Sequence, residues 1–214
     1  MTISSNLKAI QSSLSNKVTL VAVSKTKSDT AILEAYETGQ RVFGENKVQE
    51  LVQKAEKLPK DIAWHMIGHL QTNKVKFIAP FVSLIHVVDS LKLLKEINKR
   101  AEQNNRIIDC LLQVHIATET SKFGFGINEV KSTLNQTKEF QNIKIVGLMG
   151  MATFTDDTQQ VAQEFKNLKT VFDSIKNDHI TTLSMGMSGD YNLAIEQGST
   201  MVRVGSAIFG HRNK

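Results

Sequence analysis

Apolar and polar residues follow one another along the chain in a pattern that predicts strands and helices in turn. Residues 18–23 form a nearly continuous apolar run of β-branched type, which is typical of a strand buried on both faces. A helix follows, because Ile32 and Tyr36 lie one turn apart, behind a candidate N-cap at Ser28 and before a stop at Gly39. The predicted strands are residues 18–23, 41–43, 62–67, 82–88, 107–116, 143–149, 180–184 and 201–204.

Further helices are predicted between these strands. They cover residues 45–58, a segment from 72 onward, and residues 89–104, 128–137, 156–176 and 190–197. Eight strand–helix units in 214 residues predict an α/β fold, a single (β/α)8 TIM barrel near the small end of its size range. An open doubly wound sheet is the competing architecture. No linker, internal repeat or low-complexity stretch divides the chain, so we expect one domain over residues 1–214.

The composition, with 41% apolar and 22% charged residues, is that of an ordinary soluble globular protein. The single cysteine, Cys110, lies in the apolar run 107–112, so we expect it to be buried, and no disulfide can form within the chain. The N-terminal segment lacks a signal-peptide pattern, and no stretch approaches the roughly 20 apolar residues of a membrane span. We therefore expect a cytoplasmic protein with no membrane partner.

The net charge of +5 makes nucleic-acid binding a hypothesis to consider. Lysines such as Lys54, Lys57 and Lys60 are scattered along the chain, however, and Glu50 and Glu56 lie among them. The sequence contains no basic helix, no aromatic–basic stacking surface and no zinc-finger spacing. We therefore expect a solvated, mildly basic surface and no nucleic-acid partner.

Two loops rich in glycine and serine follow the last two predicted strands. Residues 184–190 follow the seventh strand and residues 205–210 follow the eighth. In a TIM barrel, phosphate groups favour the loops after these two strands. Glycine and serine allow backbone N–H groups and hydroxyls to approach an anion closely. The two loops therefore predict a phosphate-binding cradle.

Lys25 comes directly after the first predicted strand, so its amine is expected to point into the mouth of the barrel. A lysine amine that is desolvated beside other cations has a lowered pKa and becomes a nucleophile toward aldehydes. Two alternatives stay open from the residues alone. Lys25 could be an ordinary solvated lysine at a strand end, and Lys27 could take the same role from the following loop.

Arg203 is a charged residue inside the apolar run 201–205. A charge in such a position is costly unless it is paired, which indicates a function. Its side chain could reach a pyridine nitrogen or a phosphate. Because arginine stays protonated, it would keep a facing pyridine nitrogen unprotonated and so weaken the ring as an electron sink.

Several segments resemble the pyridoxal phosphate homeostasis proteins, which are single-domain relatives of the N-terminal barrel of alanine racemase. The matching segments are residues 21–27, 43–50, 64–74, 147–149, 184–188 and 202–210. The resemblance covers nearly the whole chain. It implies that Lys25 carries pyridoxal 5′-phosphate as a Schiff base and that Arg203 faces the pyridine nitrogen.

The resemblance also implies further contacts to the cofactor. The matching positions are Gly205, Ser206 and Ser188 for the phosphate, Asn46 and His65 for the cofactor lining, and Lys122 near the ring hydroxyl. From the residues alone, Asn46 could instead be a helix cap and His65 a packing residue at a strand end. The sequence departs from the family at Tyr191, where phenylalanine is expected, and a tyrosine ring could pack in the same way.

No metal site is expected, although His65 and His69 have the i, i+4 spacing of a metal-binding pair. That spacing brings two ligands together only on a helix. Here we expect His65 to end a strand and His69 to lie in the loop after Gly68. The two histidines are therefore not expected to share a ligand.

The resemblance implies a non-enzymatic protein that binds and buffers pyridoxal phosphate, with no catalytic residue. Related racemases use a tyrosine from a second domain. This chain is expected to lack that domain, and Tyr36 and Tyr191 both lie in predicted helices. We expect a monomer that hands the cofactor to apo-enzymes. A weakly active amino-acid racemase or lyase stays open, as does a cofactor-free Schiff-base aldolase, which would be colourless.

Overall fold

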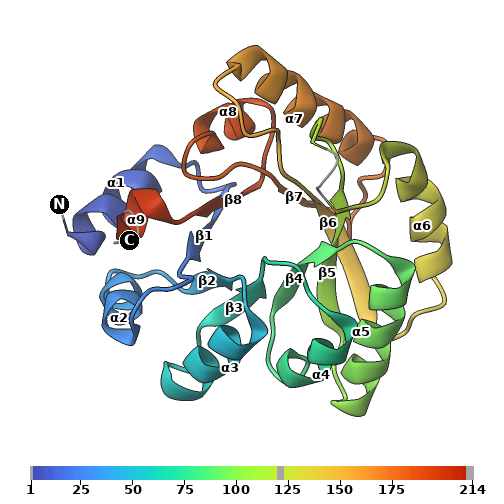
Figure 1. The fold of residues 1–214 in the computed structure, drawn as a ribbon, viewed down its shortest axis with the longest axis horizontal. Coiled ribbons are helices and arrows are strands. Elements are labelled where there is room, and N and C mark those ends of the chain that lie inside the picture. Colours follow the sequence, from blue (N-terminus) through green and yellow to red (C-terminus); the bar gives the residue numbers. More distant parts are fainter. Residues whose placement is uncertain (1, 120–122, 211–214) are drawn as a thin grey trace.

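The computed structural model describes residues 2–119 and 123–210. Within these residues, eight parallel strands form a closed barrel in which each strand pairs with its neighbours in sequence and β1 pairs with β8 (Figure 1). The strands are β1 (Thr19–Val23), β2 (Val42–Glu45), β3 (Ala63–Met66), β4 (Leu84–Val88), β5 (Ile108–Val114), β6 (Ile143–Gly150), β7 (Thr182–Ser184) and β8 (Met201–Val204). The predicted (β/α)8 barrel is confirmed, and the open sheet is wrong because its two edges are joined.

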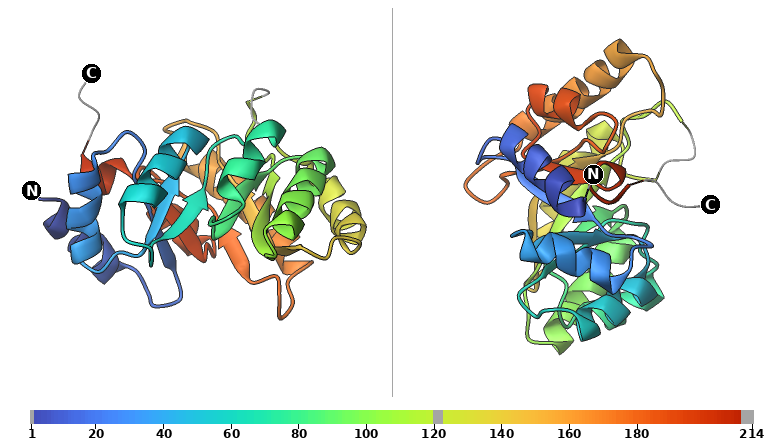
Figure 2. Two further views of the ribbon diagram at one scale, coloured as in Figure 1. Left: turned by 90° about the horizontal axis from the view of Figure 1, so that it is seen from below. Right: turned by 90° about the vertical axis from the view of Figure 1, so that its left-hand side faces the viewer.

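Helices surround the barrel on the outside (Figure 2). They are α1 (Ile3–Ser13), α2 (Asp29–Glu37), α3 (Val48–Lys57), α4 (Val75–Ile78), α5 (Leu91–Gln103), α6 (Val130–Thr137), α7 (Thr158–Asp173), α8 (Tyr191–Glu196) and α9 (Ser206–Phe209). Short 3₁₀ turns precede α4 and α6. The predicted N-cap is confirmed at Ser28, whose hydroxyl accepts a hydrogen bond from the Ala31 N–H at 3.2 Å. None of the helices in the described ranges is long and apolar enough to cross a membrane.

Two helices lie outside the predicted pattern. The first, α1, precedes the barrel, and the last, α9, follows β8; the two lie side by side at the point where the chain starts and ends (Figure 1). The side-chain amide of Asn6 in α1 donates to the Ile208 carbonyl of α9 at 3.1 Å. This contact joins the two ends of the chain on the outer side of the β1–β8 pair.

The predicted helix 45–58 is wrong at its start, because Glu45 is the last residue of β2. Its pairing with Met66 extends the ladder between β2 and β3, and α3 begins only at Val48. The predicted solvated position of Lys54 is also wrong. Lys54 lies on the inner face of α3, one turn beyond Leu51, and is buried with its ammonium paired to Glu45.

Cys110 is buried in β5, as predicted. Most of the core around it lies between the barrel and the helices, and is made of aliphatic side chains. Burial raises the pKa of the Cys110 thiol. The thiol therefore stays protonated and acts as a small apolar side chain.

The interior of the barrel, by contrast, holds a chain of polar side chains. His86 in β4 lies between His65 in β3 and Ser184 in β7: its Nε2 is 3.0 Å from His65 Nδ1, and its Nδ1 is 3.1 Å from Ser184 Oγ. Arg203 in β8 donates from Nη1 to the same Ser184 hydroxyl at 2.6 Å. Burial lowers the pKa of His65 to about 3 and the pKa of His86 well below its usual range, so both rings are neutral.

The direction of each hydrogen bond in this chain follows from the arginine, which can only donate. Ser184 accepts from Arg203, and among the described residues the only acceptor within reach of its own hydrogen is His86 Nδ1. His86 therefore carries its proton on Nε2 and donates to His65 Nδ1. Since His65 Nδ1 accepts this bond, the proton of the neutral His65 ring is on Nε2.

The neutral histidines predict how stability depends on pH. His65 has a folded pKa of about 3 against an ordinary value of 6.5, so it binds a proton more readily when the chain is unfolded. The free energy of unfolding therefore has its full value above pH 6.5 and falls as the pH drops from 6.5 toward about 3. The fall is up to about 1.4 kcal/mol per pH unit for each such histidine. The free energy of unfolding is measured by urea titration at several pH values in this range. Plotted against pH, it should have a shallower slope for His65→Asn than for the wild type. Substitution of the exposed His179 by Asn is the control, and parallel curves for the wild type and His65→Asn would contradict the prediction.

Gly147 in β6 predicts a second stability effect. A Cβ atom added there would lie 1.7 Å from the Thr182 carbonyl oxygen of β7, so the two strands would have to separate. We expect Gly147→Ala to lower the free energy of unfolding by about 3 kcal/mol or more, at the upper end of the usual cost of overpacking. Gly189→Ala is the matched control, because an added Cβ there meets nothing within 4 Å. Equal urea midpoints for the two variants would refute this account.

Candidate functional site

The loops after β7 and β8 meet at the carboxyl end of the barrel. Ser188, in the loop after β7, accepts a hydrogen bond at its Oγ from the Gly205 N–H at the end of β8, at 3.0 Å. The two loops are therefore adjacent, as one shared phosphate-binding cradle would require. Gly186 has a φ of +95°, and an added Cβ there would lie 2.6 Å from the Cβ of Ala194 in α8. A glycine at this position lets α8 pack directly against the loop.

Lys25 emerges beside these loops because β1 pairs with β8, in a register that places Ala22 opposite Val204. The Ser24 hydroxyl points outward, since it donates to Glu45 beneath α3. Lys25 is the next residue, in the turn that follows β1 at the carboxyl end of the barrel. The Lys25 side chain is half-buried.

Lys27, the other lysine considered from the sequence, is engaged elsewhere. Its ammonium donates to the carbonyls of Phe209 and Gly210 at 3.0 and 3.1 Å. These carbonyls end α9, so Lys27 ties the β1–α2 loop to that helix. Lys27 is therefore directed toward the end of α9, whereas Lys25 directly follows Ser24 in the turn after β1.

Arg203 is buried in the barrel interior, just below this mouth. Nη1 donates to the Ser184 carbonyl at 3.0 Å and to its hydroxyl at 2.6 Å, and Nη2 donates to the Gly150 carbonyl at 3.2 Å. Burial lowers the pKa of Arg203 to about 10, an effect that the charge of Asp190 opposes. Arg203 is therefore a cation at neutral pH, and these bonds use three of its five N–H groups.

Asn46 follows β2 at the same end of the barrel and is half-buried. The alternative that it caps a helix is wrong, because the N-cap position of α3 is Lys47. A Cβ added to Gly68, in the neighbouring loop after β3, would lie 2.4 Å from the Asn46 carbonyl oxygen. The loops after β2 and β3 are thus in close contact, which positions Asn46 at the mouth.

His65 lies deeper than the other predicted site residues. It is one residue from the end of β3, and its bond to His86 places it in the polar chain that ends on Arg203. It also lines a cavity of about 460 Å³ at the amino-terminal end of the barrel, together with Asp109 and Lys144. The structure therefore brings His65 to Arg203 through His86 and Ser184, and not directly to the mouth.

His69 lies away from His65 and has different partners. Its Nδ1 is 3.3 Å from an Asp89 carboxylate oxygen, and its ring stacks on Phe123 with 4.7 Å between centroids. Throughout the described part of the chain, no group of three or more His, Cys, Asp or Glu side chains could hold a metal ion. Lys122, the cationic position expected near a ring hydroxyl, lies outside the described residues.

The sequence assigned no role to His86, and it included Ser184 only as the first residue of the predicted phosphate loop 184–190; the two residues connect Arg203 to His65. A signal for His86 was present, because it is the one ionisable residue in the otherwise largely apolar segment 82–88. The same signal, a polar residue inside a buried strand, did identify Arg203. Ser184 carries no comparable signal, since a serine at a strand end is common.

Comparison with known proteins identifies the family of this chain. The family described as "Alanine racemase, N-terminal domain" matches residues 1–213. The chain is 40% identical over 201 residues to a pyridoxal phosphate homeostasis protein of Aquifex aeolicus, covering 92% of this chain and 88% of the relative. It is 38% identical over 208 residues to a protein of the same name from Escherichia coli, covering 92% and 87%.

Solved structures give the same result. PipY of Synechococcus elongatus with PLP bound is 34% identical and superposes with a TM-score of 0.88, covering 97% of this chain and 100% of PipY. Alanine racemase from E. faecalis, at 16% identity and a TM-score of 0.82, shares the fold over 98% of this chain and 58% of its own. With sequence relatives, family match and fold in agreement, the chain belongs to the pyridoxal phosphate homeostasis protein family, which is built on the alanine racemase N-terminal barrel.

Proposed function

We propose that this single barrel domain binds pyridoxal 5′-phosphate on Lys25 and maintains the intracellular supply of the cofactor without catalysing turnover. The observation that carries the proposal is the pairing of β1 with β8, which brings Lys25, Arg203 and the joined loops at Ser188 and Gly205 to one end of the barrel. The names of the relatives and the PLP-bound PipY structure support it.

The donors at this mouth fit the chemical groups of the cofactor. Ser188 accepts from Gly205, so its own hydroxyl hydrogen can be donated to a phosphate oxygen. Ser206 begins α9, in which the N–H groups of Ile208 and Phe209 donate to the Gly205 carbonyl, so the hydroxyl and N–H of Ser206 are the groups of this helix proposed to face the phosphate. A Cβ at Gly205 would lie 3.2 Å from the Cβ of Val23, so a larger residue would crowd the lysine strand.

Lys25 attaches the cofactor by condensation of its unprotonated amine with the aldehyde carbon, forming a C=N bond and releasing one water. When bound, the cofactor supplies an electron sink for amino-acid chemistry. Arg203 limits that sink, because a protonated guanidinium facing the ring nitrogen keeps that nitrogen unprotonated. Ser184, His86 and His65 orient the guanidinium, so we assign His65 a positioning role, while Asn46 lines the mouth.

We propose the absence of turnover because neither of the two tyrosines, Tyr36 and Tyr191, is placed as an acid–base group at the mouth of the barrel. A general acid–base group must lie within hydrogen-bond reach of the proton that it transfers. The Tyr36 hydroxyl donates to the Asp61 carboxylate outside the barrel, at 2.8 Å, and Tyr191 begins α8. The fold shared with alanine racemase is the observation behind the second candidate, a weakly active racemase. Transfer to apo-enzymes, a monomeric state and a cytoplasmic location stay predictions.

The attachment site is tested by borohydride reduction of the PLP-loaded protein followed by peptide mass mapping. We expect one pyridoxyl adduct, on Lys25, because the Lys27 ammonium is held by the end of α9. Lys25→Ala should lose the yellow colour and the adduct, and Lys27→Ala should keep both. An adduct on any other lysine would overturn the assignment, and a colourless wild type would favour the cofactor-free aldolase.

The absence of turnover is tested by hydrogen exchange at the α-carbon of alanine in deuterated water. An acid–base group contributes about 10²–10⁴-fold, so we expect exchange no more than about tenfold faster than with free cofactor. A chiral assay of the same samples follows the enantiomer ratio. Exchange that exceeds this limit and is lost in Lys25→Ala would support the racemase instead.

A further inference from the structure

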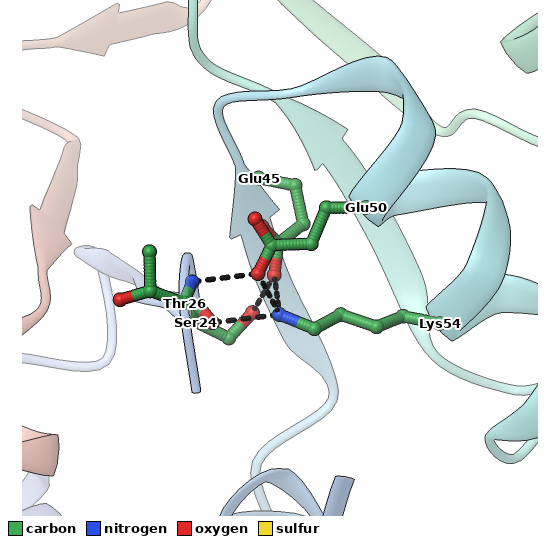
Figure 3. Close-up of polar contacts among 5 residues, drawn as sticks. All are labelled: Ser24, Thr26, Glu45, Glu50 and Lys54. Carbon is green, nitrogen blue, oxygen red and sulfur yellow. Dashed lines mark hydrogen bonds and ion pairs between the residues drawn. The ribbon is translucent and has the colours of Figure 1, made fainter. Parts of the chain in front are cut away.

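A cluster of ion pairs, buried at Ser24, Glu45 and Lys54, lies between the barrel and α3 (Figure 3). Its members come from three neighbouring elements: Ser24 and Thr26 follow β1, Glu45 ends β2, and Glu50 and Lys54 lie one turn apart on α3. We call these five residues the Lys25 clamp. Lys25 itself is the residue between Ser24 and Thr26.

The Lys54 ammonium holds the clamp together. It donates to the Glu45 carboxylate at 2.7 Å, to the Glu50 carboxylate at 2.6 Å and to the Ser24 carbonyl at 2.8 Å. The Ser24 hydroxyl donates to Glu45 at 2.6 Å, and the Thr26 N–H donates to Glu50 at 2.6 Å. Every bond is charge-assisted, so the geometry is well defined.

Stability alone is a weak explanation for this cluster. Glu45 is completely buried, and one of its carboxylate oxygens, Oε2, has no hydrogen-bond partner. Burial raises the pKa of Glu45, against the opposing effect of Lys54 and Ser24. Desolvation of a buried ion pair commonly offsets its attraction, so such pairs are better explained by a structure that they specify.

The structure that the clamp specifies is the backbone around Lys25. Lys54 binds the carbonyl of the peptide group before Lys25, and Glu50 binds the N–H of the peptide group after it. When both flanking peptide planes are held, the φ and ψ angles of Lys25 are fixed, and with them the direction of its Cα–Cβ bond.

Thr26 adds a second indication. It has a φ of +64°, and Asn105 is the only other described residue besides glycine with a positive φ. A β-branched residue strongly disfavours this conformation, which persists only where surrounding contacts impose it. Two contacts hold it here: the turn bond from Lys27 N–H to the Ser24 carbonyl, at 3.0 Å, and the bond from Thr26 N–H to Glu50, at 2.6 Å.

We infer that the Lys25 clamp is a positioning device, in which Glu50 and Lys54, from outside the barrel, aim the Lys25 amine at the aldehyde of the cofactor. Glu50 and Lys54 are positioning residues, because they act through the backbone and do not touch the cofactor. The inference rests on the proposed attachment of the cofactor to Lys25.

Glu50→Ala is the decisive variant, because it removes the acceptor of Thr26 N–H while alanine keeps α3 helical. The matched control is Glu96→Ala, which removes a similar i, i+4 ion pair with Arg100 on α5, with a comparably exposed carboxylate. Glu50→Gln keeps an oxygen that can accept from Thr26 and should recover most of the effect.

Two ligands are titrated into each variant, and melting temperatures are recorded alongside. PLP reports Schiff-base formation through its colour and through borohydride trapping. Pyridoxine 5′-phosphate has an alcohol in place of the aldehyde, so it reports binding to the mouth without Lys25 chemistry. In Glu50→Ala we expect the equilibrium constant for Schiff-base formation to fall about tenfold or more, the effect of losing one charge-assisted hydrogen bond. Binding of pyridoxine 5′-phosphate should stay within about twofold of wild type.

Two results would overturn the inference. One is an unchanged Schiff-base constant in Glu50→Ala, and the other is an equal loss of both ligands, which would mean that the clamp only supports the fold. Failure of the proposed function has a different signature: neither the wild type nor Glu96→Ala would form a trapped adduct on Lys25.

Discussion

The parallel pairing of β1 with β8 closes the barrel, and the arrangement at its mouth depends on that closure. The ladder runs from Thr19 opposite Met201 to Ala22 opposite Val204, so it joins segments from the two ends of the sequence. Such long-range pairing forms only when the intervening units are in place, because the chain must lose the entropy of loop closure before the stabilising contacts between its ends can form. Contacts outside the ladder reinforce the pairing. Asn6 in α1 donates to the Ile208 carbonyl of α9, and Lys27 donates to the carbonyls of Phe209, in α9, and of Gly210, which follows it.

Two polar systems lie on opposite sides of this closed sheet. Inside, His65, His86 and Ser184 lead to Arg203 in β8, while outside, the Lys25 clamp holds the backbone that follows β1. Buried polar groups are destabilising unless they are satisfied, and a strained residue such as Thr26 adds about 1–3 kcal/mol. An apolar interior would fold more simply. The polar systems make sense as supports that fix one cation and one amine relative to each other.

Much of the architecture could be predicted because local patterns carry it. The β-branched run that becomes β1 is apolar on both faces, and the Ser28 cap lies directly before the apolar spacing of α2. Glu45 and Lys54 were misplaced for a physical reason: a helix-compatible sequence gave way to pairing between β2 and β3, and the partner that allows Lys54 to be buried lies on another element. Short elements such as α9, with four residues, leave almost no periodic signal.

In the candidate site, too, local sequence patterns identify some features, while others depend on residues from distant elements. Arg203 was recognisable because a cation in an apolar strand must have a partner, but its actual partners are neutral oxygens of Ser184 and Gly150, which no spacing rule connects to it. Neutral acceptors leave the full positive charge of Arg203 in place, and its pKa of about 10 keeps it protonated at physiological pH. In the proposed complex, a fixed cation at the ring nitrogen and a half-buried Lys25 act in the same direction. The first suppresses turnover, and the second leaves the attachment point open to water and to competing amines, so the bond can be reversed, as storage and release of a cofactor require.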